Sequence, residues 1–336
     1  MKHRRMLARS CALTLAVVVL AVGCSSNGGD ADPARANPSI TSPAPTQSTA
    51  SPKPEVEKVD IVAVGDIACD PTSPVFDDPL YCRHEQVSRL THKLVRKGAE
   101  YFVPLGDIQY ESGAIDAFNQ VYDKYFGDLK PITRPVPGNH EYYTEGAAGY
   151  FEYFGKRAGS PRQSWSSFSP MPGWRIFLLN SNCEYIGGCG PASPQGRWLK
   201  QELKSSPETC SIAAWHHPLY TSGGYNGDQP TIDRAKPLWD AVDVGGVDIV
   251  LVGHDHIYDR FAPIGGVTEF LVGTGGKELY EIGTPAPKSR VQFADRTGVL
   301  RLTLSSDERF SYAFIDAAND KVVDAGTQRC INDPQR

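Results

Sequence analysis

Short runs of apolar residues alternate with amphipathic stretches along most of the chain. The runs are rich in Val, Ile, Leu and Phe and predict buried strands at residues 59–64, 101–105, 174–179, 211–215, 248–252 and 269–272. Apolar residues at helical spacing predict helices at residues 85–97, 114–126, 195–205 and 232–244. A further extended segment is expected at 131–136, and an antiparallel hairpin at 298–304 and 310–316. This order of elements predicts an α/β fold in which helices cover mixed β-sheets.

The N-terminal part of the chain has a different pattern. Basic residues between positions 2 and 9 precede an apolar stretch over residues 11–22, as in a secretory signal. Small residues then lead to Cys24, which resembles a bacterial lipoprotein cleavage box. We therefore expect residues 1–23 to be a lipoprotein signal peptide, and Cys24 to carry a lipid anchor on the outer face of the bacterial cytoplasmic membrane. An ordinary signal peptide and a short membrane helix are the alternatives, although a spanning helix needs about 20 apolar residues.

Composition and charge separate a linker from one large domain. Residues 24–57 consist mainly of Ser, Pro, Ala, Thr, Gly and Asn, and we expect them to form a disordered linker. Residues 58–333 are long enough for a single α/β domain. The formal net charge is -5, and removing residues 1–23, with four basic residues and no acidic one, changes it to -9. This acidity argues against nucleic acid as a partner. An anionic substrate would then need concentrated positive charge, which metal ions can supply.

Six cysteines remain after Cys11 in the leader and Cys24 at the anchor are set aside. An even number in an exported protein favours disulfides, although six cysteines allow many connectivities. Pairing between near neighbours favours Cys69–Cys82 and Cys183–Cys189, which leaves Cys210–Cys330 to hold the C-terminal tail. A cysteine-based zinc site is the alternative, and the lack of a Cys-x2-Cys pair argues against it.

Metal-competent side chains follow several of the predicted strands, often directly after a glycine. They are Asp66, Asp107, Asn139, His216, His254 and His256. Each has an ordinary alternative, as a helix cap, a turn residue or a core histidine. In α/β folds, however, ligands gather at the carboxyl ends of strands, so the coincidence of these residues favours one metal site. Such a mixture of carboxylates, an amide and imidazoles can hold two cations that share a carboxylate.

The order of these motifs resembles that of the calcineurin-like metallophosphoesterases. The motifs are Gly-Asp, Gly-Asp-x-x-Tyr, Gly-Asn-His-Glu, His and Gly-His-x-His, and they extend from Asp66 to His256. That family usually has a histidine two residues after the first aspartate, where this chain has Ala68. The chain has Tyr110 instead, and this combination is similar to the purple acid phosphatases, in which the tyrosine binds a ferric ion. The resemblance, closest to secreted bacterial members, implies a four-layer αββα sandwich of two mixed β-sheets flanked by helices.

The resemblance also assigns two sets of metal ligands that share Asp107. The first set is Asp66, Asp107, Tyr110 and His256. The second set is Asp107, Asn139, His216 and His254. A phenolate and carboxylates suit a hard trivalent ion, and imidazoles with an amide suit a divalent one, so we expect Fe(III) with Zn, Mn or Fe(II). A tyrosine that only packs against its neighbours is the alternative for Tyr110.

The implied activity is that of an acid phosphatase acting on phosphomonoesters, by in-line attack of a metal-bound or metal-bridging hydroxide. The expected substrate is a small phosphorylated molecule such as a nucleotide or sugar phosphate. Two alternatives remain open. One is a phosphodiesterase or nucleotidase with the same site, and the other is a lipoprotein that binds phosphate or metal without catalysis.

Two further histidines and one segment without histidine bear on the mechanism. We expect His140 to donate a proton to the leaving oxygen or to the equatorial charge, or else to hydrogen-bond a carboxylate such as Glu141. His217 is expected to be structural. Plant purple acid phosphatases often have further substrate-contacting histidines after the residue that corresponds to His216. Residues 220–228 contain none, and Tyr225 or Asn226 are the candidates to replace them.

Overall fold

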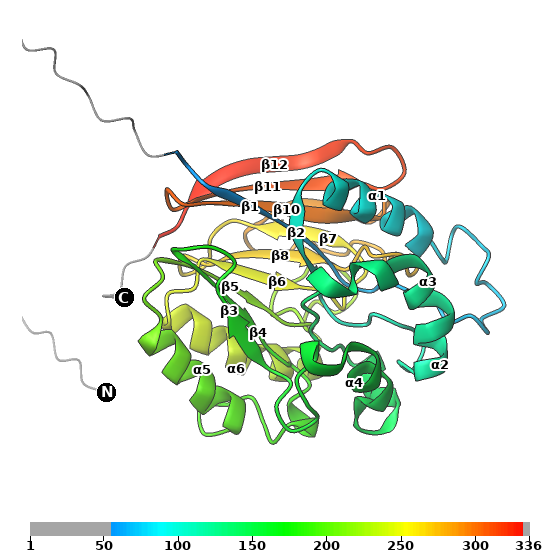
Figure 1. The fold of residues 1–336 in the computed structure, drawn as a ribbon, viewed down its shortest axis with the longest axis horizontal. Helices are drawn as coiled ribbons and strands as arrows, with labels where there is room; N and C mark the ends of the chain where they lie inside the picture. Colours follow the sequence, from blue (N-terminus) through cyan, green and yellow to red (C-terminus); the bar gives the residue numbers. More distant parts are fainter. Residues whose placement is uncertain (1–54, 332–336) are drawn as a thin grey trace, which may run out of the picture. The chain divides into compact units, whose positions relative to one another are not determined.

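The computed structural model describes residues 55–331 of the protein, which are drawn in colour in Figure 1. The expected signal peptide, the lipidation site Cys24 and nearly all of the expected linker lie outside the described residues. No helix within residues 55–331 combines the length and apolar character needed to cross a membrane.

Five strands form the first sheet, in the order β12-β11-β10-β1-β2. Strand β1 runs parallel to the edge strand β2, and the other pairs are antiparallel. The register of β1 and β2 aligns Val64 with Pro104, so both chains leave the sheet at the same edge. The strands are β1 (Lys58–Val64), β2 (Ala99–Pro104), β10 (Gly298–Ser305), β11 (Arg309–Asp316) and β12 (Val322–Arg329).

Seven strands form the second sheet, in the order β3-β4-β5-β6-β8-β7-β9. Its centre, β4-β5-β6-β8, is parallel, whereas β3, β7 and β9 pair in the antiparallel sense. The strands are β3 (Ser166–Phe168), β4 (Trp174–Leu178), β5 (Cys210–Ala214), β6 (Ile249–Val252), β7 (Tyr258–Phe261), β8 (Thr268–Val272) and β9 (Ser289–Phe293). Both sheets are therefore mixed.

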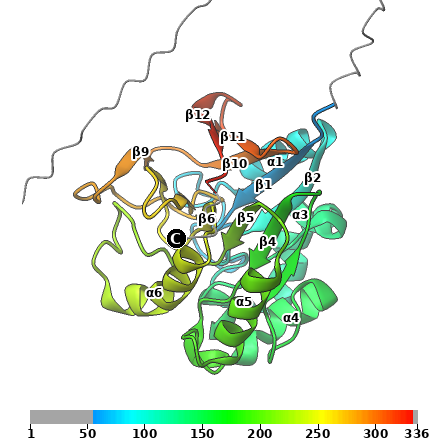
Figure 2. The ribbon, with the colours of Figure 1, turned by 90° about the vertical axis from the view of Figure 1, so that its left-hand side faces the viewer.

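Alternating side chains of the second sheet separate two hydrophobic cores. Ile176, Ile212 and Ile249 point into a core that also contains strands of the first sheet. Their neighbours Phe177, Ala213 and Val250 point into a second core, which includes Leu199 of α5 (Pro194–Ser205) and Leu238 of α6 (Gln229–Val244). Because successive strand residues face opposite sides, these strands are buried on both faces. Helix α1 (His84–Arg96) lies beside the first sheet, which completes the four layers seen in Figures 1 and 2 and confirms the expected fold.

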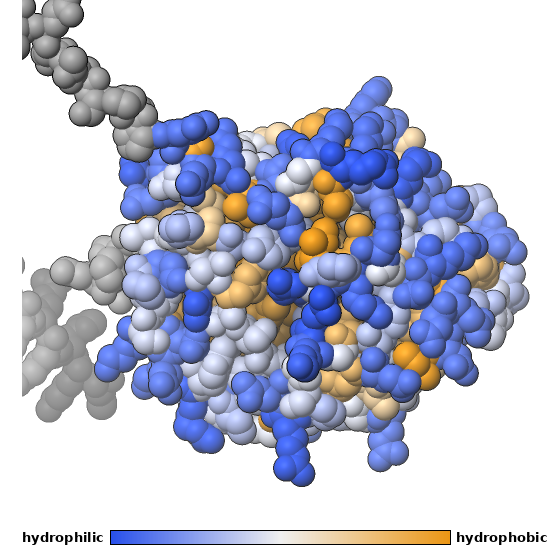
Figure 3. Space-filling view, in the orientation of Figure 1, coloured by the Kyte–Doolittle hydropathy of each residue, from blue (hydrophilic) through white to orange (hydrophobic). Residues whose placement is uncertain are grey.

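The two helices on the second sheet begin at residues suited to helix starts. Ser193 accepts a hydrogen bond from the Gly196 N–H at 3.0 Å, and Asp228 accepts one from the Thr231 N–H at 2.9 Å. Such caps satisfy amide groups that have no partner inside the helix. The face of the molecule in Figure 3 is mostly hydrophilic, with its apolar residues in small separate groups. Leu199 of α5 and Leu238 of α6 are buried in the core, whereas Val244 at the end of α6 is exposed.

The remaining helices are short and lie mainly between β2 and β4. They are α2 (Ile115–Ala117), η1 (Phe118–Tyr122), α3 (Asp123–Phe126), η2 (Gly127–Ile132), η3 (His140–Tyr143), η4 (Glu145–Ala147), α4 (Ala148–Phe154), η5 (Gly155–Arg157) and η6 (Cys183–Tyr185). The helix expected at 114–126 is present, with a π-helical turn at its centre. The strand expected at 131–136 is wrong in its first part, where Pro131 lies in a 3-10 turn that suits its fixed φ. Only Thr133 and Val136 pair with β2 or the residue after it.

The structure contains three disulfides, Cys69–Cys82, Cys183–Cys189 and Cys210–Cys330. These are the pairs that neighbour pairing favoured, and they use all six cysteines of residues 55–331. The alternative, a zinc site built from cysteines, is therefore wrong for the described residues. Cys210 begins β5 and Cys330 follows β12, so the third bond connects the end of the first sheet to the second.

Candidate metal centre

The side chains predicted to bind metal come together where the strands end. Asp66 and Asp107 directly follow the Gly residues after β1 and β2, and the backbones of these two loops are hydrogen-bonded to each other. The Asp66 N–H donates to the Gly106 carbonyl at 3.0 Å, and the Ile67 N–H donates to the Asp107 carbonyl at 2.9 Å. His216 follows β5, and the two histidines of the Gly-His-x-His motif follow β6. The junction of the two sheets therefore gathers residues that are up to 190 positions apart in the chain.

One group of donor atoms surrounds the hydroxyl of Tyr110, which is buried. This oxygen lies 3.0 Å from Asp66 Oδ1, 2.9 Å from His256 Nε2 and 3.4 Å from Asp107 Oδ2. His256 Nε2 is in turn 3.4 Å from Asp66 Oδ1. All four atoms of the first predicted ligand set thus converge on one point. The hydroxyl of Tyr110 belongs to the polar cluster, so a purely packing role does not fit it.

The second group of donor atoms surrounds His216 Nε2. This nitrogen lies 3.3 Å from Asp107 Oδ2, 3.2 Å from Asn139 Oδ1 and 3.3 Å from His254 Nδ1. The Asn139 amide nitrogen donates to the Tyr143 hydroxyl at 3.4 Å, which turns the amide oxygen toward the histidines. The two groups meet at Asp107, whose Oδ2 belongs to both. The geometry therefore divides the seven side chains as the two expected sets.

The hydrogen bonds of the histidines show that this donor set fits cations. The Nδ1 atoms of His216 and His256 lie 2.7 Å from the Leu105 carbonyl and 2.6 Å from the Glu278 carbonyl. A carbonyl only accepts, so Nδ1 carries the proton, and in the neutral ring Nε2 presents a lone pair. The lone pair of His216 faces the oxygens of Asp107 and Asn139, which are also acceptors, and that of His256 faces Asp66 Oδ1 and the Tyr110 hydroxyl. A cation between them satisfies every one of these atoms, and metal-bound histidines are usually oriented in this way.

The charges within the cluster favour bound positive charge. Burial by itself would lower the pKa of His216, but the charge and the hydrogen bond of Asp107 outweigh it and raise this pKa to about 9. Burial opposes ionisation of Asp107 as well, yet His216 and His140 hold its pKa well below the usual range. Without metal ions, a proton on His216 therefore supplies the positive charge that the carboxylates require.

Three of the candidate ligands have a left-handed backbone. The φ angles are 62° for Asp66, 46° for Asp107 and 73° for His254. This region is unfavourable for residues other than glycine, and such strain is often found at functional sites. The strained turns let the side chains leave the strand ends toward one another instead of continuing the alternation of a strand.

Glycines next to the ligands allow the close approach of the loops. A Cβ on Gly106 would lie 2.4 Å from His216 Nδ1, and a Cβ on Gly138 would lie 2.1 Å from Asp107 Oδ1. Both distances are far shorter than a van der Waals contact. The glycines in the Gly-Asp and Gly-Asn-His-Glu motifs are therefore required by the packing of ligand against backbone.

Glu141 organises two of the ligand loops, a role that the sequence did not reveal. Its fully buried carboxylate accepts four backbone N–H groups, at 3.0 Å from Asp107, 2.8 Å from Ile108, 3.3 Å from Gln109 and 2.7 Å from Gly138. Burial and the charge of Asp107 raise the pKa of Glu141 to about 7, against the effect of the amide donors. The only signal in the sequence was its place at the end of the Gly-Asn-His-Glu motif.

His140 lies at the edge of the second group. Its backbone N–H donates to Asp107 Oδ1 at 2.9 Å, and its Nε2 lies 3.8 Å from Asp107 Oδ2. Its Nδ1 is 2.6 Å from the carbonyl of Glu111, so the suggested partner Glu141 is wrong. The side chain is 20% exposed, so it can be reached from solvent while facing the shared carboxylate.

His217 lies beside the site without joining it. Its Nδ1 is 2.7 Å from the Ser181 hydroxyl, and its ring centroid is 4.5 Å from that of His254. Burial and the neighbouring His254 lower the pKa of His217 well below its ordinary value. A neutral, buried ring that supports a ligand histidine agrees with the structural role expected from the sequence.

The residues after His217 place a tyrosine at the site. The ring of Tyr225 lies 4.1 Å from that of His254, whereas the side chain of Asn226 donates to the Thr284 carbonyl. Tyr225 is therefore the better candidate for the position where related phosphatases have histidines. A second tyrosine, Tyr280, lies 4.0 Å from His256, and no sequence motif pointed to it.

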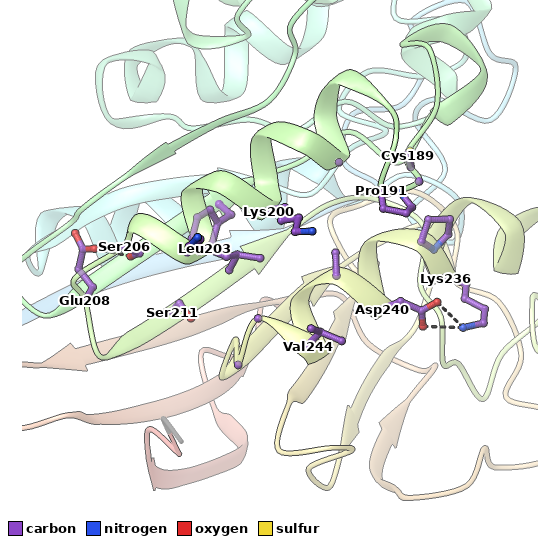
Figure 4. A pocket seen from close by; sticks show the side chains of 18 of the residues that line it. Cys189, Pro191, Lys200, Leu203, Ser206, Glu208, Ser211, Lys236, Asp240 and Val244 are labelled. Atoms are coloured by element: carbon purple, nitrogen blue, oxygen red, sulfur yellow. Dashed lines mark hydrogen bonds and ion pairs between the residues drawn. The ribbon is translucent and has the colours of Figure 1, made fainter. Parts of the chain in front are cut away.

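A separate cavity of about 1150 Å³ opens between α5 and α6. Figure 4 shows that its lining includes Lys200 and Leu203 of α5 and Asp240 of α6. None of the seven candidate ligands lines this cavity. The metal-competent cluster is thus a distinct place in the fold.

Comparison with known proteins agrees with this geometry. Residues 59–258 match the model of the calcineurin-like phosphoesterase family. Tartrate-resistant acid phosphatase type 5 of Rattus norvegicus is 24% identical over 239 residues, which cover 64% of this chain and 71% of that protein. The family match includes all seven candidate ligands, from Asp66 to His256.

Solved structures show the same fold. Purple acid phosphatase PPD1 from yellow lupin seeds has a TM-score of 0.65 and 19% identity, and the match covers 83% of this chain and 55% of the lupin chain. A dimetal phosphatase from Danio rerio has a TM-score of 0.56 and 17% identity, with 81% of this chain and 99% of that chain covered. The chain spans only about half of the lupin protein. It belongs to the calcineurin-like phosphoesterase family and is a metallophosphoesterase similar to the purple acid phosphatases.

Proposed function

We propose that this protein is a phosphomonoesterase of the acid phosphatase type with two metal ions. The observation that carries the proposal is the convergence of two donor sets on Asp107 Oδ2. The set with Asp66, Tyr110 and His256 offers a phenolate and carboxylates and suits Fe(III). The set with Asn139, His216 and His254 suits a divalent ion such as Zn, Mn or Fe(II).

Bound cations supply polarisation of the phosphoryl oxygens and a lowered pKa of bound water. The protein contributes position. Glu141 accepts the N–H groups of Asp107 and Gly138, which holds together the loops that carry the shared carboxylate and Asn139. The pinned Nδ1 atoms of His216 and His256 keep the ligating nitrogens aimed at the centre.

His140 is the proposed proton donor to the leaving oxygen. Its Nδ1 proton is bonded to the Glu111 carbonyl, so only the protonated ring can donate through Nε2. That atom faces the cluster 3.8 Å from Asp107 Oδ2, near the place where the phosphoryl group must bind. We further propose that Tyr225, against His254, contacts the substrate in place of the missing histidines.

The test of the activity compares a monoester with a diester. We expect purified protein to hydrolyse 4-nitrophenyl phosphate faster than bis(4-nitrophenyl) phosphate, since the site is proposed for monoesters. The opposite preference would identify a phosphodiesterase. No hydrolysis of either ester, together with tight phosphate binding, would identify a binding protein.

The test of the metal assignment combines elemental analysis with an absorption spectrum. We expect iron plus a divalent metal, and a visible charge-transfer band that Tyr110→Phe removes while most of the metal content is retained. The matched control is Tyr153→Phe, a buried tyrosine whose hydroxyl bonds Asp123 instead of the cluster. Wild-type protein without iron and without the band would show that Tyr110 is not a ferric ligand.

We also propose that the protein acts on small phosphorylated molecules outside the cytoplasmic membrane, anchored through Cys24. The three disulfides support export, because such bonds persist in oxidising compartments. Metabolic labelling with a fatty acid should mark the wild type but not Cys24→Ser. Equal labelling of the two proteins would contradict the anchor.

A further inference from the structure

One ammonium group joins two loops beside the first donor set. Lys277, in the loop after β8, donates to Glu111 in the loop after β2, and its Nζ lies 3.2 Å from the Glu278 carboxylate. The same Nζ lies 4.9 Å from the centre of the Tyr110 ring. The side chain of Lys277 is only 11% exposed, against 49% for Glu111 and 34% for Glu278. The charge of Lys277 is therefore held mostly away from solvent, between two loops and against a candidate ligand.

The two glutamates that Lys277 joins each hold a histidine of the site through the backbone. The Glu111 carbonyl lies 2.6 Å from His140 Nδ1, and the Glu278 carbonyl lies 2.6 Å from His256 Nδ1. The direction of each imidazole ring therefore depends on where these two carbonyls lie. Binding of both carboxylates by one ammonium group restricts the movement of one loop relative to the other.

Lys277 also restrains a carboxylate that lies close to His140. Oε2 of Glu111 is 3.8 Å from His140 Nδ1, whereas the Glu111 carbonyl is 2.6 Å from the same nitrogen. A small movement of the Glu111 side chain would let the carboxylate replace the carbonyl as the partner of Nδ1. The ammonium group opposes this movement because it binds Oε1 of the same carboxylate. His140 thereby keeps the orientation in which its Nε2 faces Asp107.

The backbone at Lys277 is attached to the loop that carries Asp66. The Lys277 N–H donates to the Asp66 carbonyl at 3.2 Å, and the Gly275 N–H donates to the Gly65 carbonyl at 2.9 Å. The base of the Lys277 side chain is thus fixed against the backbone of a candidate ligand. A preorganised side chain loses less conformational freedom in forming its ion pairs than an ordinary surface lysine does.

We propose that Lys277 is a positioning residue of the phosphomonoesterase. Its ammonium group orients the rings of His140 and His256 by fixing the carbonyls that they bond. Its charge, 4.9 Å from the centre of the Tyr110 ring, also stabilises the electrons of a phenolate at this position. The inference rests on the proposed function and, for the effect on the ring, on the ferric ion proposed at Tyr110.

The experiment compares variants of the full chain purified with its metals. Lys277→Met removes the charge while keeping an unbranched side chain, and Lys277→Arg restores the charge. The matched control is Lys130→Met, because the Lys130 Nζ lies 3.6 Å from the ring centre of Tyr153, outside the cluster. Melting temperature and iron content are measured for each variant, so that only folded protein with its metal is compared.

The visible charge-transfer band of Lys277→Met should move to longer wavelength, because less energy is then needed to remove an electron from the phenolate. The kcat for glycerol 2-phosphate should fall by roughly tenfold, with a smaller change in KM, since a displaced proton donor affects the chemical step. The kcat for 4-nitrophenyl phosphate should fall less, because its leaving oxygen needs little help from a proton donor.

The other two variants show whether the charge and its place are responsible. Lys277→Arg should keep the band of the wild type and recover most of the kcat for glycerol 2-phosphate. Lys130→Met should match the wild type in the band and in both kcat values.

Two results would overturn the inference while leaving the phosphatase intact. One is a Lys277→Met protein that matches Lys130→Met in the band and in both kcat values. The other is a loss of kcat that is equal for the two esters and is not recovered in Lys277→Arg, which would assign Lys277 a merely structural role.

Failure of the proposed function is recognised in the wild type. If the wild type contains no iron, the effect on the Tyr110 ring is refuted, and the kcat values alone decide the effect on the histidines. If the wild type hydrolyses no monoester, the proposed function itself fails and the inference fails with it.

Discussion

Replacing Glu141 by glutamine tests whether one buried carboxylate organises the site. The carboxylate accepts two N–H groups at each oxygen, those of Ile108 and Gln109 at Oε1 and those of Asp107 and Gly138 at Oε2. Glutamine keeps only one acceptor oxygen. Whichever oxygen becomes an NH2 group, two buried N–H groups lose their partner and face another donor.

The magnitude follows from those two groups. An unsatisfied buried N–H costs about 1–3 kcal/mol, so Glu141→Gln should lower the free energy of unfolding by about 2–6 kcal/mol. A domain of this size loses roughly 2–4 °C of melting temperature for each kcal/mol. The loops of Asp107 and Gly138 should also loosen, so metal content should fall with stability.

The assay is thermal unfolding in the presence of a chelator, because bound metal would stabilise the folded state by mass action. Metal content is measured separately on protein purified without chelator. The control is Glu100→Gln, the same change at an exposed residue of β2, which should stay within about 0.5 kcal/mol of the wild type. A Glu141→Gln protein that melts with this control and retains its metal would refute the reasoning.

Three further predictions address the metal centre, the pH dependence and the disulfides. Asp107→Asn should remove most phosphatase activity and lower the content of both metals, since this carboxylate belongs to both sets; turnover near the wild-type rate would contradict a shared ligand. Burial, reinforced by Lys124, lowers the pKa of His84 to about 4. Between pH 6.5 and 4, His84 therefore binds a proton in the unfolded chain but not in the folded protein. The free energy of unfolding should fall by about 3 kcal/mol as the pH drops through this window. Urea unfolding should show that His84→Leu lacks this part of the pH dependence, and an identical pH profile would count against it. Replacing Cys210 and Cys330 together by alanine removes a disulfide with a sequence separation of 120. The free energy of unfolding, measured in urea, should fall by about 4 kcal/mol. Equal stability of the variant and the wild type would contradict the prediction.

The sequence was informative where the deciding contacts are local. The strands β1, β2, β5 and β6 were predicted because buried strands read as continuous apolar runs, and the ligands follow them directly. The edge strand β12 was missed because it is half exposed and contains few apolar residues. The strand expected at residues 131–136 was wrong in its first part, because an apolar run with a proline does not distinguish a strand from a tight helical turn. Pro131 lies in a 3-10 turn.

The seven candidate ligands could be proposed from the sequence, because short motifs after apolar runs single out six of them and the resemblance to the purple acid phosphatases adds Tyr110. The tertiary structure decided how they are held. Glu141 acts through backbone N–H groups, which have no side-chain signature in any sequence. His140 bonds the Glu111 carbonyl, and Tyr280 stacks on His256, because loops from separate strands pack at the same edge of the sheets. Side-chain chemistry can be read along a chain, whereas the orientation of a ring or a carbonyl depends on the folded backbone.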